Sequence, residues 1–310
     1  GRATAQSNAF AIARPALGGG NLWAEGYRSN WSANSEGCTM KTGFQIDRRN
    51  FLALSAAGAI SPAEASSPGE TTPQLFQHGV ASGDPTQSSV LLWTRLTPIA
   101  SSAVEDVSVQ WMIARDNSFS DLVKQGNDVA RSADDFTLTI DVEGLEPGTT
   151  YYYRFTSQGQ VSRVGRTQTL PHGSPNDFRI AVVSCANYAS GFFNAYRDIL
   201  DQGDIDLVVH LGDYIYEEGL GGFGTQNARE LDRVPAPNKE LVTLEDYRTR
   251  YAQYRMDADL QDLHASVPFI CVWDDHEIVT GTWAGGSVVH VEAVHGSWPD
   301  RQNDPIQADQ

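Results

Sequence analysis

The sequence predicts an α/β domain, with a sheet layered by helices, preceded by a small β-sandwich. Three observations support this fold class. Short β-rich runs separated by turns fill residues 76–171. After residue 175, continuous apolar runs alternate with helical periodicity, as is typical of a parallel sheet. A Pro/Gly/Ser-rich segment at 171–176 separates the two patterns and predicts a domain boundary.

The sandwich is predicted from five β-rich runs and one turn motif. The runs are Ser89–Leu96, Val107–Ala114, Phe136–Val142, Tyr151–Ser157 and Val161–Thr169. Leu145-Glu-Pro-Gly-Thr-Thr-Tyr151 matches the L-x-P-x-T-x-Y corner of fibronectin type III-like domains, in which the tyrosine hydroxyl bonds to upstream backbone. We therefore expect a fibronectin type III-like β-sandwich with a structural role.

The second region, residues 176–310, is predicted to contain three buried strands and at least two helices. The strands are predicted at 179–183, 205–210 and 268–273, with a helix over 192–200 between the first two. Thr243 and Asp246 predict a capped helix start. That helix should present Leu244, Tyr247, Tyr251 and Tyr254 on one face, and a second helical turn carries Leu260 and Leu263.

Composition indicates a globular, acidic protein. With 310 residues, 40% of them hydrophobic, the chain can bury a sizeable core. Its formal net charge of -17 disfavours binding to the nucleic-acid backbone, itself a polyanion. We therefore expect no stable nucleic-acid complex, and instead bound cations or a small substrate. Three cysteines, Cys38, Cys185 and Cys271, do not support a disulfide scaffold.

A twin-arginine (Tat) signal peptide is predicted over residues 40–65. Arg48 and Arg49 precede a short Ala/Leu-rich run, and Ala63-Glu64-Ala65 matches an A-x-A cleavage site. The alternative is an ordinary Ala-rich helix start. The apolar run is too short to span a bilayer, so we expect no integral membrane segment. We expect export by the Tat machinery to the periplasm or the cell exterior.

Residues 1–39 precede Met40 and are rich in Gly, Ser, Asn and Ala. Because Met40 opens a signal peptide of ordinary length, we interpret 1–39 as upstream non-coding or disordered sequence. Cys38 then has no expected role. Residues 66–74 are rich in Ser, Pro, Thr and Glu, which indicates a linker, so folded structure should begin near Phe76.

Possible metal ligands follow each of the three buried strands. They are Cys185 after the first, Asp213 and Tyr216 after the second, and Asp274, Asp275 and His276 after the third. Because the carboxyl ends of parallel strands open on one crevice, we expect these side chains to converge. An Asp can bridge two cations, and a tyrosine can bind as phenolate to a strong Lewis acid such as Fe³⁺.

Each of these residues also has a plain structural interpretation. Asp213 could cap a helix, Cys185 could be a buried small hydrophobe, and Trp273-Asp-Asp-His-Glu277 could be a solvated acidic turn. Two adjacent carboxylates after an apolar strand would repel unless cations neutralised them, which favours the metal site. His276 could be a ligand or could donate to a substrate oxygen, and we favour the second. Cys271 lies within the third strand and is expected in the core, and His78, His210 and His264 are expected as core or surface residues and not as ligands.

Five ordered blocks resemble the PhoD-like alkaline phosphatases of the calcineurin-like metallophosphoesterase superfamily. The blocks are Gly79-Val-Ala-Ser-Gly-Asp84-Pro85, Leu92-Trp-Thr-Arg95, Ser184-Cys-Ala-Asn-Tyr188, His210-Leu-Gly-Asp-Tyr-Ile-Tyr-Glu217 and Trp273-Asp-Asp-His-Glu277. The resemblance implies a β-sandwich followed by a metallophosphoesterase domain, Tat export, and hydrolysis of phosphate monoesters and diesters by a metal-activated water. It also implies Fe³⁺ and Ca²⁺ as cofactors and phosphate esters as substrates.

The resemblance assigns roles by motif position. Cys185 and Tyr216 would bind the iron, Asp213 would bridge the metals, and Asp275 would bind at the second metal position. His276 would stabilise the phosphoryl transition state. Asn187, Asp274 and Glu277 are possible supporting residues.

Two departures from the family pattern leave other functions open. Glu277-Ile-Val-Thr280-Gly281-Thr-Trp283 lacks a polar pair usual in the family, and the family's H-x-H metal block is not found before Gln310, so we expect only the N-terminal portion of the domain, C-terminally truncated. One alternative is therefore a catalytically inactive fragment or a secreted β-sandwich binding module. Another is a phospholipase D-like phosphodiesterase.

Overall fold

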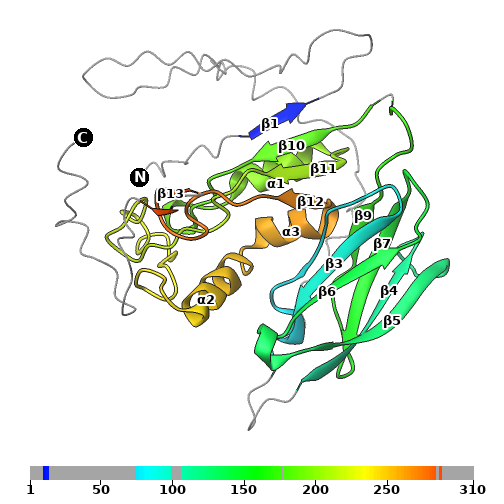
Figure 1. Cartoon of the computed structure of the whole chain (residues 1–310), viewed down its shortest axis with the longest axis horizontal. Helices are drawn as coiled ribbons and strands as arrows, with labels where there is room; N and C mark the ends of the chain where they lie inside the picture. The colour runs from blue at the N-terminus through cyan, green and yellow to red at the C-terminus, as the bar shows by residue number, and fades with distance from the viewer. Residues whose placement is uncertain (1–9, 14–73, 99–105, 176, 284–285, 288–310) are drawn as a thin grey trace, which may run out of the picture. The chain divides into compact units, whose positions relative to one another are not determined.

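Two larger β-sheets and three α-helices form most of the part of the chain that the computed structural model describes, residues 10–13, 74–98, 106–175, 177–283 and 286–287 (Figure 1). The strands are β1 (Phe10–Ala13), β2 (Val80–Gly83), β3 (Ser89–Arg95), β4 (Val107–Ala114), β5 (Leu122–Ala130), β6 (Thr137–Glu143), β7 (Thr150–Ser157), β8 (Gln160–Val161), β9 (Gly165–Gln168), β10 (Ile180–Val183), β11 (Leu207–His210), β12 (Phe269–Cys271), β13 (Thr282–Trp283) and β14 (Gly286–Ser287). The helices are α1 (Asn194–Gln202), α2 (Leu244–Tyr254) and α3 (Ala258–Ser266), with short 3-10 helices η2 (Gln74–Phe76), η3 (Ser132–Asp134) and η4 (Tyr188–Ser190). The predicted signal peptide with Arg48 and Arg49, and Cys38, lie outside these residues.

A seven-stranded sheet joins the two regions that the sequence placed in separate domains. Its order is β1-β10-β11-β12-β2-β3-β6. β10, β11 and β12 are parallel, and β12 meets β2 where Phe269 lies opposite Gly83. A Cβ on Gly83 would lie 3.0 Å from the Phe269 carbonyl oxygen, so the strands approach closely there because residue 83 has no side chain. The predicted boundary near residue 175 therefore does not separate two sheets.

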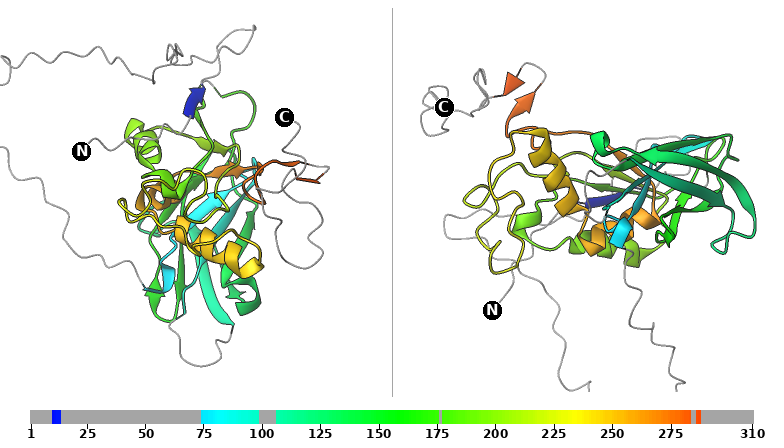
Figure 2. Two further views of the ribbon diagram at one scale, coloured as in Figure 1. Left: turned by 90° about the vertical axis from the view of Figure 1, so that its left-hand side faces the viewer. Right: turned by 90° about the horizontal axis from the view of Figure 1, so that it is seen from below.

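The second sheet has the order β5-β4-β7-β8, with β9 also paired to β7. Figure 2 shows its strands, in green, in two further views of the chain. Its inward residues, such as Ile113 and Tyr153, share one buried core with Leu92 of β3 and Ile140 of β6. The backbone N–H of Glu146 donates to the Tyr151 hydroxyl at 2.9 Å, which confirms the predicted tyrosine corner bond.

The strand predictions missed β2 and β5 and joined β8 and β9 into one run. β5 contains Lys, Gln, Gly, Asn and Asp and lies at a sheet edge, where all of its residues but Ala130 are exposed or partly exposed, so it has no apolar alternation. β2 is only four residues long and contains Ser and Gly, which also give no strand pattern.

The helices cover the parallel strands. α1 and α3 pack against each other, and Ile199 of α1 and Leu263 of α3 share a core with Val183 and Val208. α2 begins with the predicted capping box, because Thr243 Oγ1 accepts the Asp246 N–H at 3.2 Å and Asp246 Oδ2 accepts the Thr243 N–H at 3.0 Å.

The predicted apolar face of α2 is correct except at Leu244, because Tyr247 and Tyr251 pack, partly buried, against the core that contains Tyr254. Tyr254 is buried, whereas Leu244 is 66% exposed. Leu244 is the first residue of the helix. None of the described helices is long and apolar enough to cross a membrane.

Residues 1–39 were expected to be non-coding or disordered sequence, but they contain the strand β1. Phe10–Ala13 pairs antiparallel with β10, with Phe10 opposite Val183. This pairing satisfies backbone groups of β10 that would otherwise form an open sheet edge.

Candidate metal centre

The candidate ligands follow strand ends that lie in register. Val183, His210 and Cys271 are neighbours across β10, β11 and β12. Since these strands are parallel, all three segments that follow leave the sheet at the same edge. They lead to Cys185, to Asp213 and to Asp275.

One group of donors consists of Asp213, Asp275 and His276. Each offers a ligand atom, and these atoms lie within 4.8 Å of one another. Asp213 is buried and the other two are half-buried. The backbone N–H of His276 also lies 3.4 Å from Asp213 Oδ1.

A second group of donors shares Asp213. The Tyr216 hydroxyl donates to Asp213 Oδ2 at 3.1 Å. The Cys185 thiol lies near enough to the Asp213 carboxylate and the Tyr216 hydroxyl for these groups to influence one another's pKa. The Tyr216 and His276 rings lie with centroids 4.1 Å apart. Asp213 therefore belongs to both groups, and the structure brings together all five residues that the sequence proposed as metal or catalytic residues.

The backbone at these turns is unusual. Cys185 and Asp213 have φ angles of 58° and 53°, a left-handed conformation that is rare outside glycine. Gly212 has φ 100°, and a Cβ there would lie 2.4 Å from the Asp274 amide nitrogen. Such conformations occur at functional sites, where the surrounding structure holds them.

The electrostatics of the two groups fit a metal ion. Burial raises the pKa of the Asp213 carboxyl, the Cys185 thiol and the Tyr216 phenol, so the protein alone disfavours their anionic forms. A nearby cation reverses that preference. Carboxylate, imidazole, phenol and thiol donors around one carboxylate suit metal binding.

Glu277 holds the turns that carry the donors. Its side chain is buried, and Oε2 accepts the N–H groups of Asp213 at 3.0 Å and Asp274 at 2.7 Å. The Tyr214 N–H donates to the other oxygen. Glu277 was predicted as a supporting residue, and in the structure it connects the turn after β11 to the turn after β12.

Glu217 orients His276, and the sequence analysis did not single it out. The His276 Nδ1–H donates to Glu217 Oε2 at 2.7 Å, and Thr280 donates to Oε1 from both its N–H and its hydroxyl at 2.9 Å. Burial opposes the charged imidazole, but the hydrogen bond and charge of Glu217 raise the pKa of His276 overall. The only sequence signal was its place beside Tyr216 in the block His210–Glu217.

Arg250 was also missed, because its partners are distant in the chain. It is almost fully buried, and its guanidinium donates to carbonyl oxygens of the segment after Tyr216, including those of Tyr216, Glu218 and Ala236. Arg250, a residue of α2, therefore holds the segment that follows Tyr216 against this helix.

Two predicted supporting residues lie outside both donor groups. Asn187 caps η4, accepting the Ala189 N–H at 3.0 Å and donating to the Phe223 carbonyl oxygen at 3.1 Å. The Asp274 side chain is exposed and accepts the Asp275 N–H at 3.0 Å.

The prediction for Cys271 was wrong, whereas those for the three histidines were correct. Cys271 is exposed, so its predicted core position was wrong; it ends β12 and lines an open cavity. His78, His210 and His264 are buried, and each has a hydrogen-bond partner, as expected for core histidines.

Two family models match the chain. One, described as "PhoD-like phosphatase", matches residues 180–308, and one described as "PhoD-like phosphatase, N-terminal domain" matches residues 61–171. The chain belongs to the PhoD-like phosphatase family.

Two individual PhoD-like proteins are also similar to this chain. Alkaline phosphatase D of Bacillus subtilis (strain 168) is 38% identical over 250 residues, which are 75% of this chain and 42% of that protein. A solved structure described as "Structure of PhoD" matches with a TM-score of 0.62 and 38% identity, covering 69% of this chain and 41% of that one. The chain thus spans less than half the length of these PhoD-like relatives.

Proposed function

We propose that the chain carries a metal centre of a phosphoric ester hydrolase that acts on phosphate monoesters and diesters. The observation that carries this proposal is that one buried carboxylate, Asp213, belongs to two groups of potential ligands. A shared carboxylate between two donor sets is the arrangement that a bridged pair of cations needs. Membership of the PhoD-like family gives the reaction class.

The donor types suggest which cation belongs to which group. Thiol and phenol donors, from Cys185 and Tyr216, suit Fe³⁺. The carboxylate of Asp275 suits a hard cation such as Ca²⁺. When bound, the cations would lower the pKa of a water molecule and offset charge on the phosphoryl oxygens.

The protein's own groups would orient the substrate. Because Nδ1 of His276 donates to Glu217, its other ring nitrogen, Nε2, is left to interact with a phosphoryl oxygen. Glu217 also favours the protonated imidazole, which can donate that hydrogen bond. His276 is therefore proposed as the residue that stabilises the transition state.

The domain and export assignments belong to the same proposal. The tyrosine corner at Tyr151 supports a fibronectin type III-like sandwich, and the parallel strands with α1 and α3 support metallophosphoesterase layering. The motif with Arg48 and Arg49 supports Tat export to the periplasm or cell exterior. A reporter fusion to residues 40–75 with Arg48→Lys and Arg49→Lys as the comparison would test the export route.

The test of function is metal analysis of the purified chain, combined with assays on p-nitrophenyl phosphate and bis-p-nitrophenyl phosphate. We expect bound iron, a visible band lost in Tyr216→Phe, and hydrolysis lost in Asp213→Asn. Asp141→Asn is the matched control, because Asp141 is exposed on β6. A metal-free, inactive protein would instead favour the binding-module alternative, and activity confined to the diester would favour the phosphodiesterase alternative.

A further inference from the structure

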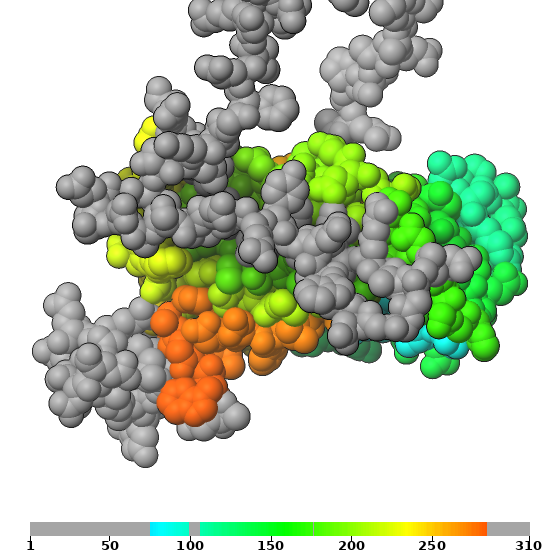
Figure 3. All heavy atoms as spheres, turned by 90° about the horizontal axis from the view of Figure 1, so that it is seen from above, coloured from blue at the N-terminus to red at the C-terminus, as the bar shows by residue number. Residues whose placement is uncertain are grey.

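A compact turn over residues 278–282 follows the candidate residues Asp275 and His276. The backbone N–H groups of Ile278 and Val279 both donate to the Asp275 carbonyl oxygen, at 3.0 and 2.8 Å. Val279 is buried, whereas the orange segment near the C-terminal end of the described residues forms part of the molecular surface in the space-filling view (Figure 3). The turn therefore lies between the core and the surface, and its backbone is bonded to that of a candidate ligand.

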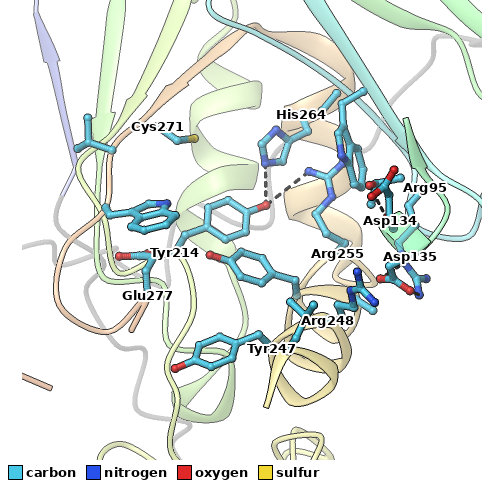
Figure 4. Close-up of a pocket in the computed structure, with 18 residues that line it drawn as sticks. Arg95, Asp134, Asp135, Tyr214, Tyr247, Arg248, Arg255, His264, Cys271 and Glu277 are labelled. Atoms are coloured by element: carbon cyan, nitrogen blue, oxygen red, sulfur yellow. Dashed lines mark hydrogen bonds and ion pairs between the residues drawn. The ribbon is translucent and has the colours of Figure 1, made fainter. Parts of the chain in front are cut away.

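Helix α2 anchors the same turn. The Tyr247 hydroxyl donates to the Ile278 carbonyl oxygen. Tyr247 and Glu277 line a neighbouring cavity of about 540 Å³, together with Arg255, and the close-up shows these side chains on its wall (Figure 4). Because Glu277 also accepts N–H groups of the turns after β11 and β12, the turn over residues 278–282 starts from a residue that is itself held in place.

Thr280 contacts the carboxylate that orients His276. Glu217 Oε1 accepts both the N–H and the hydroxyl of Thr280 at 2.9 Å, and Glu217 Oε2 accepts the His276 Nδ1–H at 2.7 Å. The Glu217 side chain is fully buried, so its charge must be balanced by donors of this kind. Because the two oxygens belong to one planar group, donors that fix Oε1 also fix the direction in which Oε2 accepts.

The next residue, Gly281, contacts a second carboxylate of the candidate metal centre. Its backbone N–H donates to Asp275 Oδ2. Gly281 has a φ angle of 74°, a left-handed conformation that glycine adopts without steric cost. The successive N–H groups of Thr280 and Gly281 therefore bind two different carboxylates, that of Glu217 and that of a candidate ligand.

We propose that Thr280 and Gly281 are positioning residues of the metal centre. Thr280 acts on His276 through Glu217, and Gly281 acts on Asp275 directly. Neither residue is a proposed ligand. The inference rests on the role proposed above for His276 in phosphate ester hydrolysis, but the hydrogen bonds that carry it join groups of the chain itself and can be measured without metal.

Thr280→Val tests the hydroxyl, because valine has a similar shape and keeps the backbone N–H but has no O–H. In metal-free protein with isotope-labelled histidine, NMR should show the His276 Nδ1–H exchanging with water about 5- to 10-fold faster, the effect of one weakened hydrogen bond. Thr280→Ser, which restores an O–H, should return the exchange rate to near the native value. Thr282→Val is the matched control, because the Thr282 hydroxyl donates to the Val279 carbonyl oxygen of the same turn, at 2.6 Å, and not to Glu217.

Hydrolysis of p-nitrophenyl phosphate by the metal-loaded chain gives a second readout for the same variants. Thr280→Val should lower kcat by about tenfold with little change in KM, since His276 is proposed to act on the transition state, and Thr280→Ser should restore kcat. An exchange rate that stays native in Thr280→Val, or that rises equally in Thr282→Val, would overturn the role of Thr280. If the native chain has no hydrolytic activity, the proposed function fails, and the exchange measurement alone decides this inference.

Gly281→Ala tests the contact with the second carboxylate. A side chain at a φ angle of 74° should shift the turn and draw the N–H away from Asp275, so the Ca²⁺ affinity of metal-free protein should fall by about tenfold. Gly173→Ala is the matched control, because Gly173 has a similar φ angle of 78° and an added Cβ would meet nothing within 4 Å. Isothermal titration with Ca²⁺ would compare the two variants, and equal affinities would overturn the role of Gly281.

Discussion

The Glu277 carboxylate accepts the backbone N–H of Asp213 at 3.0 Å, across 64 positions of the sequence. The same oxygen accepts the Asp274 N–H, so one buried side chain sets the spacing between the turns after β11 and β12. The arrangement of the candidate metal ligands therefore depends on a residue that is not itself a proposed ligand.

Replacing Glu277 with Gln should loosen both turns, because an amide presents an N–H₂ group where one carboxylate oxygen now accepts. We expect metal affinity to fall by about 10- to 100-fold, the usual effect of losing a group that orients ligands. Isothermal titration of metal-free protein with Ca²⁺ would measure this. Glu245→Gln, at an exposed position of α2, is the control, and equal affinity in both variants would contradict the prediction.

Glu217→Gln should lower the pKa of His276 in metal-free protein. Burial alone lowers it, and the hydrogen bond and charge of Glu217, followed by the charges of Asp213 and Asp275, raise it in the native chain. NMR titration of the His276 ring would report the shift, with the exposed His172 as an internal reference. A His276 pKa that stays the same in the variant would show that other groups hold the imidazole charged.

Gly212→Ala should destabilise the turn that carries Asp213. The added Cβ would lie 2.4 Å from the Asp274 amide nitrogen, at a φ of 100° that alanine rarely adopts. We expect a loss of about 1–3 kcal/mol of unfolding free energy, measured by urea denaturation. Gly191→Ala is the matched control, because a Cβ there meets nothing within 4 Å, and similar losses in both variants would refute this account.

Tyr151→Phe should cost about 1–2 kcal/mol of unfolding free energy, because the Glu146 N–H loses its acceptor in a partly buried hydrogen bond. The neighbouring Tyr152→Phe, which keeps that bond, should have little effect on urea denaturation. If the two variants were equally stable, the corner bond would contribute nothing measurable.

His78 should make the protein sensitive to acid. Burial, together with Arg95 and Arg255, lowers its pKa to about 4 from the ordinary value of 6.5. The unfolded chain therefore binds a proton at higher pH than the folded one, so stability present above pH 6.5 is lost as pH falls towards 4, by about 3 kcal/mol. His78→Gln should remove this part of the pH dependence, whereas His172→Gln should leave it intact, as unfolding curves at several pH values would show.

The sequence determined the features that depend on neighbours along the chain. The capping box of Thr243 and Asp246, the corner at Tyr151 and the candidate ligands after three apolar runs all follow from local spacing. Convergence of these ligands could be expected as well, because parallel strands open on one crevice.

Only the tertiary structure decided the features that depend on pairs distant in sequence. The pairing of β12 with β2 merges two predicted sheets into one, and Glu217 meets His276 across 59 positions. The cavity beside Arg255 is likewise formed by residues of β3, α2, α3 and β12. Such contacts leave no periodic signal in the sequence, because they are set by how the elements pack and not by the order of residues within each element.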